Sequence, residues 1–317
     1  MPTPSESVQS PESKVQSREW AARTDTPKRS VFGNYRGDGA PSTASARSDS
    51  NAQQAETVLG APLQFTIDLA VARSFIHRFL AKAYEDPMPQ TWRWLTQART
   101  INSLRAANVF AGQSLLPSAE VLINALQPAG YDAFLNAYLA AFGHAARGSC
   151  PLNEIEYGDI KADPLFQPHR LADLAAFYRA FGLEVTEDAG ERQDHLCLEL
   201  EFLCVLAAKE AYALEHQLDA DQLTQCREAQ KKFLREHLGR WTPAFARRLA
   251  SATNEPALRA LAEFTRAVIE SECARFGVNP GSEELSLRPV DEAADRACDS
   301  CGINNLPPGA LAAEAVT

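Results

Sequence analysis

Residues 195–216 read HLCLELEFLCVLAAKEAYALEH, a run in which large apolar side chains outnumber charged ones. The run contains neither proline nor glycine, so no residue in it breaks a helix of that length. Apolar residues occupy most faces of such a helix, and a helix that is hydrophobic around most of its circumference is buried in the protein interior. We therefore expect one central buried helix here, packed against other elements.

The same helical periodicity continues on both sides of this run. Phe65, Leu69, Ile76 and Leu80 recur at helical intervals and so share one face of a helix. The pattern predicts helices over about 62–85, 92–110, 118–127, 131–142, 171–182, 195–216, 219–238, 242–252 and 256–276. No stretch shows the alternation of a strand. The sequence therefore predicts an all-α fold with a single helical-bundle domain over residues 62–277.

The two ends of the chain have a different composition. Residues 1–58 are rich in Ser, Pro, Gly, Thr and mixed charges, without a helical or strand period, which is typical of disorder. Beyond Gly277 the chain returns to Pro, Gly, Ser and acidic residues. We expect a disordered N-terminal extension over residues 1–58 and a flexible C-terminal tail over residues 278–317.

The net charge excludes some partners. The chain of 317 residues has 31 Lys and Arg against 41 Asp and Glu, a formal charge of −10, and its first 60 residues hold seven of each sign. The acidity therefore belongs to the predicted domain, which disfavours nucleic acid and favours a cationic partner. The sequence has neither a run of about 20 apolar residues that could span a membrane nor an N-terminal secretory signal, so we expect a cytoplasmic protein.

Catalytic motifs are missing from the sequence. It has no phosphate loop, no dinucleotide fingerprint, no His-Glu-x-x-His pair and no Gly-x-Ser-x-Gly elbow, so we expect no catalytic residues and no cofactor of its own. Cys298 and Cys301, in CDSCGINN, have the spacing of half a tetrahedral zinc site, but two further ligands are needed. An alternative function is therefore a zinc- or redox-dependent helical protein that uses Cys298 and Cys301, with Cys150 and His144 as further ligands.

An acidic loop lies between two predicted helices. Residues 150–159 read CPLNEIEYGD, with Glu154, Glu156 and Asp159 around the aromatic Tyr157. Three carboxylates so close in sequence create a local negative centre. Two interpretations stay open. The carboxylates form a functional negative centre, or the loop is only solvated surface, as charged loops often are.

A second segment, ERQDH at residues 191–195, leads into the central helix. Asp194 stands where an N-cap residue would accept backbone amide hydrogens, and His195 would then lie in the first turn. Capping accounts for Asp194 and leaves a second role open for the exposed edge of the Asp-His pair.

Taken together, these segments carry a resemblance. PLNEIEYG, LADLAAFYRAFGLEV and ERQDHLCLELEFL, followed by KEAYALE and AQKKFLREHLGRWTPAFARRL, resemble the TorD/DmsD/NarJ family of cytoplasmic chaperones for molybdenum enzymes. The similarity covers roughly residues 65–277. It is strongest to the branch that serves ethylbenzene dehydrogenase, dimethylsulfide dehydrogenase and the selenate and chlorate reductases.

The resemblance implies an all-helical chaperone without catalytic activity. Members bind the twin-arginine signal of an apo catalytic subunit and hold that subunit in the cytoplasm until molybdopterin guanine dinucleotide is inserted. At the family's signal-binding positions this chain has Asp194, His195, Glu154 and Tyr157. Two positions depart from the family pattern: Arg192 replaces a frequent proline, and Asn153 replaces a tyrosine of the nearer relatives.

A twin-arginine signal presents two guanidinium groups followed by an apolar stretch, which requires carboxylates beside an apolar groove. We therefore expect four carboxylates, Glu154, Glu156, Asp159 and Asp194, to face a common cleft. The groove is expected from Leu152, Tyr157, Phe166 and Leu196. A scaffold that bridges two proteins is the third interpretation. The sequence does not distinguish a monomer from a domain-swapped dimer, for which the segment 143–167 would serve as the hinge.

Overall fold

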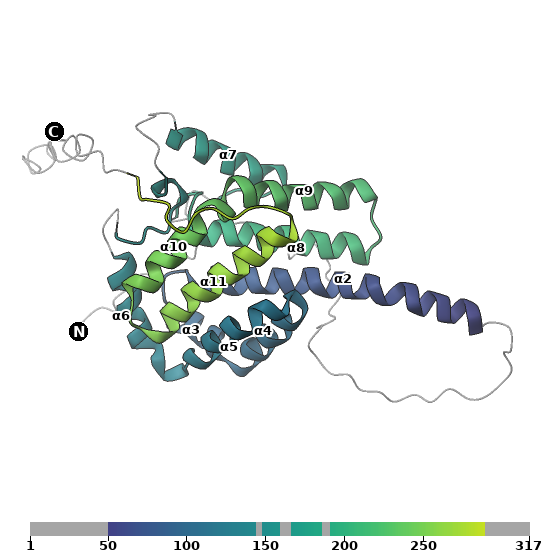
Figure 1. The fold of residues 1–317 in the computed structure, drawn as a ribbon, viewed down its shortest axis with the longest axis horizontal. Helices are drawn as coiled ribbons and strands as arrows, with labels where there is room; N and C mark the ends of the chain where they lie inside the picture. Colours follow the sequence, from purple (N-terminus) through teal and green to yellow (C-terminus); the bar gives the residue numbers. More distant parts are fainter. Residues whose placement is uncertain (1–49, 144–147, 159–165, 186–190, 289–317) are drawn as a thin grey trace, which may run out of the picture.

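The computed structural model describes residues 50–143, 148–158, 166–185 and 191–288. Within these ranges the chain forms ten α-helices and no strand, only two isolated β-bridges, which confirms the all-α prediction (Figure 1). The helices are α2 (Ser50–Ala83), α3 (Pro89–Thr96), α4 (Ala98–Ala111), α5 (Leu116–Ala125), α6 (Tyr131–Phe142), α7 (Phe166–Ala180), α8 (Leu196–Glu215), α9 (Ala220–Glu236), α10 (Leu238–Ala252) and α11 (Pro256–Arg275). None of these helices has the length and apolar character that crossing a bilayer requires.

Helix α8 is the central helix that its apolar sequence predicts. Most of its side chains are buried, and its most extensive packing is against α2. On its other side the Phe202 ring packs 4.8 Å from Phe233 of α9 and 6.2 Å from Phe177 of α7, measured between ring centroids. Such aromatic pairs stabilise a core beyond the area they bury. Helices α7 and α9 therefore cover the side of α8 that faces away from α2.

A second part of the core joins α2 to α10 and α11. Tyr84, at the end of α2, packs 5.5 Å from Phe245 of α10, and its hydroxyl lies 2.9 Å from the Thr265 hydroxyl of α11. Trp241 of α10 is fully buried and packs against the same Phe245. These contacts hold the C-terminal end of α2 against the middle of α10 and α11, and Trp241 also packs against Tyr157 of the loop that contains residues 150–158.

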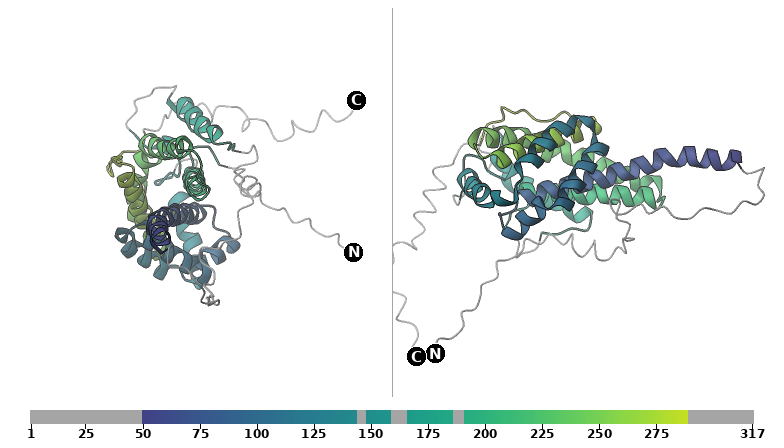
Figure 2. Two further views of the ribbon diagram at one scale, coloured as in Figure 1. Left: turned by 90° about the vertical axis from the view of Figure 1, so that its right-hand side faces the viewer. Right: turned by 90° about the horizontal axis from the view of Figure 1, so that it is seen from below.

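Several helix boundaries differ from the sequence prediction. Helix α7 begins at Phe166 rather than at 171, and α10 begins at Leu238 rather than at 242. Helix α2 begins at Ser50 rather than near residue 62, so residues 50–58 of the predicted disordered extension are helical in the backbone. The N-terminal part of α2 projects beyond the neighbouring helices (Figure 2). The pattern over 92–110 is two helices instead of one, because Gln97 adopts an extended backbone with ψ of 144° between α3 and α4.

Residues 278–288 continue beyond the last helix and pack on the domain. The Gly281 amide donates to the Gly239 carbonyl at 2.9 Å, and Leu287 forms an antiparallel bridge with Tyr157. A Cβ atom at Gly281 would lie 1.8 Å from the Arg240 carbonyl oxygen, so only glycine allows this approach. The sequence boundary at residue 277 therefore marks the end of the helices and not the end of the packed chain. We call residues 278–288 the C-terminal strap.

Candidate functional site

The two segments singled out in the sequence lie against each other in the structure. Asn153 and His195 form an antiparallel bridge, flanked by hydrogen bonds from the Glu154 amide to the Asp194 carbonyl at 2.9 Å and from the Leu196 amide to the Leu152 carbonyl at 2.8 Å. This pairing brings the loop at 150–158 onto the N-terminus of α8. It places Glu154, Glu156, Tyr157, Asp194 and His195 in one region, whereas Asp159 lies outside the described residues.

Glu154 is completely buried and surrounded by cationic or proton-donating groups. Its carboxylate lies 2.6 Å from Arg170 Nη2, 3.2 Å from Arg240 Nη2 and 2.9 Å from His237 Nδ1. Burial alone would raise the pKa of Glu154, but the His237 hydrogen bond and the two arginines lower it below its ordinary value. The ionised carboxylate is thus neutralised inside the protein.

Asp194 is also completely buried, and its carboxylate binds the loop rather than the helix. It accepts hydrogen bonds from the Ile155 amide at 3.2 Å, from two Arg192 nitrogens at 3.0 Å each and from the Asn153 side-chain amide at 3.2 Å. Arg192 and Asn153 are the two positions that depart from the family pattern. Both departures therefore supply partners to the same carboxylate.

The prediction that Asp194 caps α8 is wrong. The N-cap is His195, whose Nδ1 accepts the Cys197 amide at 3.3 Å. Burial lowers the pKa of His195 to about 4, so the imidazole is neutral near pH 7 and can accept this hydrogen bond. Asp194 accepts from the loop amide because the pairing of Asn153 with His195 brings Ile155 within reach.

Three of the four carboxylates predicted to line an open cleft do not do so. Glu154 and Asp194 have no exposed surface and Glu156 has 8%. In addition, Glu156 Oε1 lies 3.7 Å from Arg192 Nη2. The predicted apolar groove also fails for Leu152, Tyr157 and Leu196, which are buried in the core, while the Phe166 side chain lies outside the described set. The segments converge as expected, but as an interior polar cluster.

Sequence reasoning missed a third buried acid in this cluster. Glu199 of α8 is completely buried and accepts a hydrogen bond from Trp241 Nε1 at 3.1 Å. Burial and the nearby Glu154 charge raise the pKa of Glu199 well above its ordinary value, which favours the neutral acid at this position. The signal for it was a glutamate inside the apolar run LCLELEFL. We call Glu154, Asp194 and Glu199 the buried acid cluster.

Tyr157 belongs to the floor of the same region. Its side chain is completely buried, its hydroxyl donates to the Pro151 carbonyl at 2.9 Å, and its ring packs 5.0 Å from Trp241. Tyr157 therefore fixes the loop onto α10 and does not reach solvent.

Accessible carboxylates lie at the edge of the buried acid cluster. The Glu191 side chain is 37% exposed, with an oxygen 3.5 Å from His195 Nε2, and Asp86 is exposed at the end of α2. Burial raises the pKa of Glu191, and the Asp86 charge adds to this increase. Among the described residues, neither forms an ion pair with a lysine or arginine. We call Asp86 and Glu191 the acidic edge.

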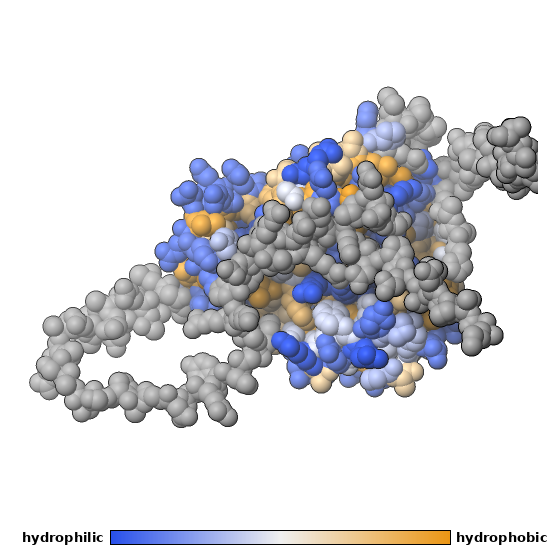
Figure 3. All heavy atoms as spheres, turned by 180° about the vertical axis from the view of Figure 1, so that it is seen from behind, coloured by the Kyte–Doolittle hydropathy of each residue, from blue (hydrophilic) through white to orange (hydrophobic). Residues whose placement is uncertain are grey.

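An apolar groove runs between α7 and α9. Its cavity has a volume of about 520 Å³, and Phe177, Phe181 and Ala229 line it together with Lys232 and Arg235. Seen from behind, hydrophobic side chains gather among hydrophilic ones along the upper edge of the molecule, where α7 and α9 run in Figure 1 (Figure 3). Tyr178 of α7 donates to the Gln193 carbonyl at 2.8 Å, which connects this helix to the segment that carries Glu191.

The described part of the chain supplies no further ligands for the alternative metal site that was expected at Cys298 and Cys301. No group of three His, Cys, Asp or Glu side chains there is arranged to hold a metal ion. Cys150 is a buried free thiol. His144, Cys298 and Cys301 lie outside the described residues.

Comparison with known proteins places the chain in a family. The family model described as "Nitrate reductase delta subunit" matches residues 112–247, which include the loop, the Asp-His pair and α8. The selenate reductase assembly chaperone of Thauera selenatis is 38% identical over 145 residues, which cover 44% of this chain and 72% of that protein.

Shorter alignments agree with this assignment. The chlorate reductase assembly chaperone of Ideonella dechloratans is 39% identical over 79 residues, 25% of this chain and 39% of that protein. The chaperone protein TorD of Vibrio cholerae (strain M66-2) is 34% identical over 95 residues, 30% of this chain and 41% of that protein. The chain therefore belongs to the TorD/DmsD/NarJ family of assembly chaperones, in the branch of the selenate and chlorate reductase chaperones.

Proposed function

We propose that the chain is the assembly chaperone of a molybdenum-containing reductase. It binds the apo catalytic subunit through its twin-arginine signal and holds it in the cytoplasm until molybdopterin guanine dinucleotide is inserted. The observation that carries the proposal is the 38% identity over 72% of a selenate reductase assembly chaperone. Because the relatives are named as chaperones and not as catalysts, the chain acts as a binding protein rather than as an enzyme.

The acidic edge supports recognition of the two arginines. Asp86 and Glu191 carry carboxylates whose mutual repulsion a guanidinium would relieve, and each oxygen pair can accept a bidentate bond from arginine. The buried acid cluster serves a different purpose, since arginines inside the protein already compensate the charges of Glu154 and Asp194. Glu156 lies close to Arg192, which follows Glu191 of the acidic edge in the sequence. The Arg192 side chain is about half exposed.

The groove between α7 and α9 is where we place the apolar stretch of the signal. Phe177 and Phe181 provide the apolar wall, and amphipathic segments bind such grooves through side chains spaced along one face. The hydrogen bond between Tyr178 and Gln193 joins this helix to the segment that carries Glu191, which supports a single peptide that contacts both the groove and the acidic edge.

The motif residues Glu154, Tyr157, Asp194 and His195 then act as positioning residues in this proposal. They fix the loop at 150–158 and the segment at 191–195 against each other, which sets the position of Glu191. This division of roles accounts for a motif that is shared with signal-binding relatives and yet buried.

Calorimetric titration of the full chain with a synthetic twin-arginine signal peptide tests the proposal. The peptide should lose affinity when both arginines become alanine. D86N/E191Q should weaken binding of the arginine peptide at least tenfold, since the loss of even one charge-assisted bond worth about 1.5–3 kcal/mol corresponds to about tenfold or more. The control variant E120Q alters a carboxylate that is paired with Arg105 on α4, away from the motif. Equal affinity for both peptides would refute the recognition of arginine. Equal effects of E120Q and D86N/E191Q would refute the acidic edge as its site.

A further inference from the structure

The N-terminal extension contains a short segment with the two features that the proposed site would recognise. Residues 26–36 read TPKRSVFGNYR, in which Lys28 and Arg29 are adjacent and Val31 and Phe32 follow closely. The segment has three basic residues and no acidic one. Its order, two adjacent cations and then apolar side chains, is the order in which a twin-arginine signal presents its groups. The segment lies outside the described residues, and we call it the signal-like segment.

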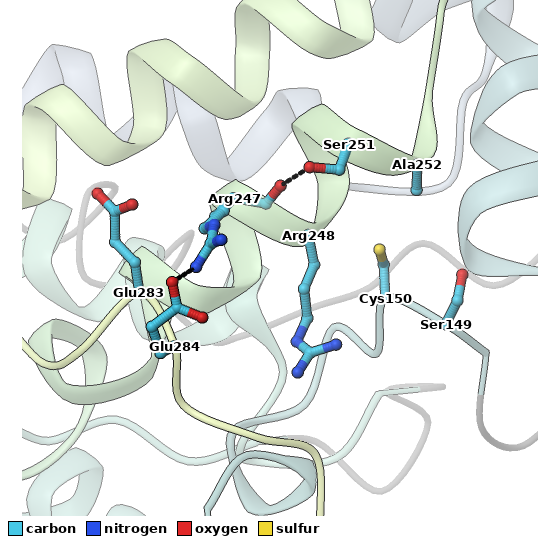
Figure 4. A pocket seen from close by; sticks show the side chains of 8 residues that line it. All are labelled: Ser149, Cys150, Arg247, Arg248, Ser251, Ala252, Glu283 and Glu284. Atoms are coloured by element: carbon cyan, nitrogen blue, oxygen red, sulfur yellow. Dashed lines mark hydrogen bonds and ion pairs between the residues drawn. The ribbon is translucent and has the colours of Figure 1, made fainter.

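The sequence has two other pairs of adjacent basic residues, and both belong to helices. The pair at 231–232 lies in α9 and is followed by Phe233, which is completely buried. The pair at 247–248 lies in α10, where Arg247 forms an ion pair with Glu284 of the C-terminal strap (Figure 4). The remaining pair, in the signal-like segment, lies outside the described helices.

The acidic edge has carboxylates available to such a pair. Both are accessible, and among the described residues neither forms an ion pair with a lysine or arginine. The cations beside the edge are already paired, because Lys82 lies 2.6 Å from Glu85 and Arg192 lies 3.0 Å from Asp194. The acidic edge therefore has an excess of negative charge that attracts a cationic segment.

The connecting chain is long enough to bring the signal-like segment to the acidic edge. Residues 30–49 connect Arg29 to the start of α2 at Ser50, and Asp86 follows the other end of this helix. The 34 residues of α2 span about 50 Å at a rise of about 1.5 Å per residue. A chain of about 20 residues spans up to about 70 Å when it is extended, so the cations reach the edge.

The order of the groups along the segment also matches the site. Gln230 of α9 follows the groove residue Ala229 and accepts a hydrogen bond from Arg73 of α2 at 2.6 Å. Arg73 lies between Ser50 and Asp86 in the sequence of α2 and its C-terminal end, so the groove is level with this part of the helix. A chain that runs back from Ser50 therefore passes the groove with its apolar pair before its cations reach the acidic edge.

We propose that the signal-like segment occupies the signal-binding site of its own chain when no client is bound. Lys28 and Arg29 contact the acidic edge, and Val31 and Phe32 cover part of the groove between α7 and α9. This inference rests on the proposed function, which places the twin-arginine signal at the same two surfaces. The segment thus protects the apolar groove and competes with the signal.

The internal segment binds more weakly than a true signal for two reasons. Lys28 is a point charge without the planar pair of donors with which arginine binds a carboxylate. Gly33 and Asn34 end the apolar stretch after two residues, so most of the groove gains no contact. A signal with two arginines and a longer apolar stretch therefore displaces the segment.

Titration of the full chain with the synthetic twin-arginine signal peptide tests the inference. K28A/R29A should bind the signal peptide about three- to tenfold more tightly than the parent chain, because the internal competitor is lost. K28R should bind it at least twofold more weakly than the parent chain, because a second arginine strengthens the competitor. The matched control R18A/R23A removes the same charge from two separated positions of the extension, and it should leave the affinity unchanged.

A labelled peptide of residues 26–36, added to K28A/R29A, separates this inference from the proposed function. It should bind this variant, and adding D86N/E191Q should weaken its binding at least fivefold. The inference is overturned if the parent chain, K28A/R29A and K28R bind the signal peptide equally, or if R18A/R23A strengthens binding as much as K28A/R29A does. It is also overturned if D86N/E191Q leaves binding of the labelled peptide unchanged. The proposed function fails on a different result, equal affinity for signal peptides with and without the arginines.

Discussion

His237 Nδ1 donates to Glu154 Oε2 at 2.9 Å across 83 residues of sequence. His237 is the residue between α9 and α10, and both side chains are completely buried. The hydrogen bond therefore connects the junction of two helices to the loop at 150–158. Arg170 adds a second attachment, because it donates both to Glu154 and to the Glu236 carbonyl.

Loss of the Glu154 charge should destabilise the fold. E154Q leaves the partly buried Arg170 and Arg240 without their carboxylate, and breaking an ion pair whose acid is fully buried costs up to about 3–5 kcal/mol. We expect the free energy of unfolding to fall by about that amount in urea denaturation. A decrease of under about 1 kcal/mol would show that the arginines find other partners.

The neighbouring acid should behave in the opposite way. Because burial raises the pKa of Glu199 and so favours its neutral form, E199Q mimics that form in charge and shape and keeps an oxygen that can accept from Trp241. We expect a change in the free energy of unfolding of less than about 1 kcal/mol, within the range for neutral hydrogen-bond exchange. E154Q and E199Q are isosteric substitutions in one cluster, so equal losses in both would contradict the assigned charge states.

Stability should decrease in mild acid because of two buried histidines. Burial lowers the pKa of His77 to about 4 and that of His195 to about 4, whereas an unfolded chain keeps the ordinary value of 6.5. Between these values the unfolded chain binds protons that the folded chain does not, so the free energy of unfolding falls as the pH falls from about 6.5 to about 4. Each histidine contributes roughly 3 kcal/mol to this loss.

Urea unfolding of H77Q across this pH window checks the effect. H77Q should remove the contribution of His77 to the acid-induced decrease in the free energy of unfolding. By linkage, this contribution is roughly half of the decrease that the two histidines cause together. The control H216Q, which changes an exposed histidine at the end of α8, should leave it unchanged. If H77Q retained the full decrease, the histidine assignment would be wrong.

The C-terminal strap should detach when Gly281 acquires a side chain. G281A introduces a Cβ that clashes with the Arg240 carbonyl, so the hydrogen bonds from Gly158 to Ser286 and from Arg288 to Glu156 should be lost with it. We expect faster proteolytic cleavage within residues 281–288. G130A is the control, because its Cβ would meet its nearest neighbour, Trp92, at 3.4 Å. Equal cleavage rates in the two variants would contradict the tight packing of the strap.

The helices were predictable because their signals are local. The apolar run at 195–216 and the periodic residues of α2 report which faces are buried, whatever the partner helix. The break at Gln97 was missed because a single extended residue leaves the apolar spacing of 92–110 almost intact. The start of α2 at Ser50 was missed because the composition of its first residues is also typical of a loop.

The burial of the acidic loop could not be read from its own residues. Glu154 is neutralised by Arg170, Arg240 and His237. These residues come from α7, α10 and the junction of α9 and α10, so the loop sequence CPLNEIEYGD alone cannot predict them. Asp194 was assigned to capping because capping is a local rule. Its actual partner, the Ile155 amide, is brought close only by the pairing of Asn153 with His195.

The central claim is that the chain holds an immature reductase subunit by its signal. The most direct measurement is co-purification of the tagged full chain with a co-expressed molybdenum-containing catalytic subunit, in cells that do not make the cofactor. We predict a complex of the two proteins when the twin-arginine signal is intact, and loss of that complex when both arginines become alanine. Recovery of the subunit in equal amounts with either signal would contradict the claim.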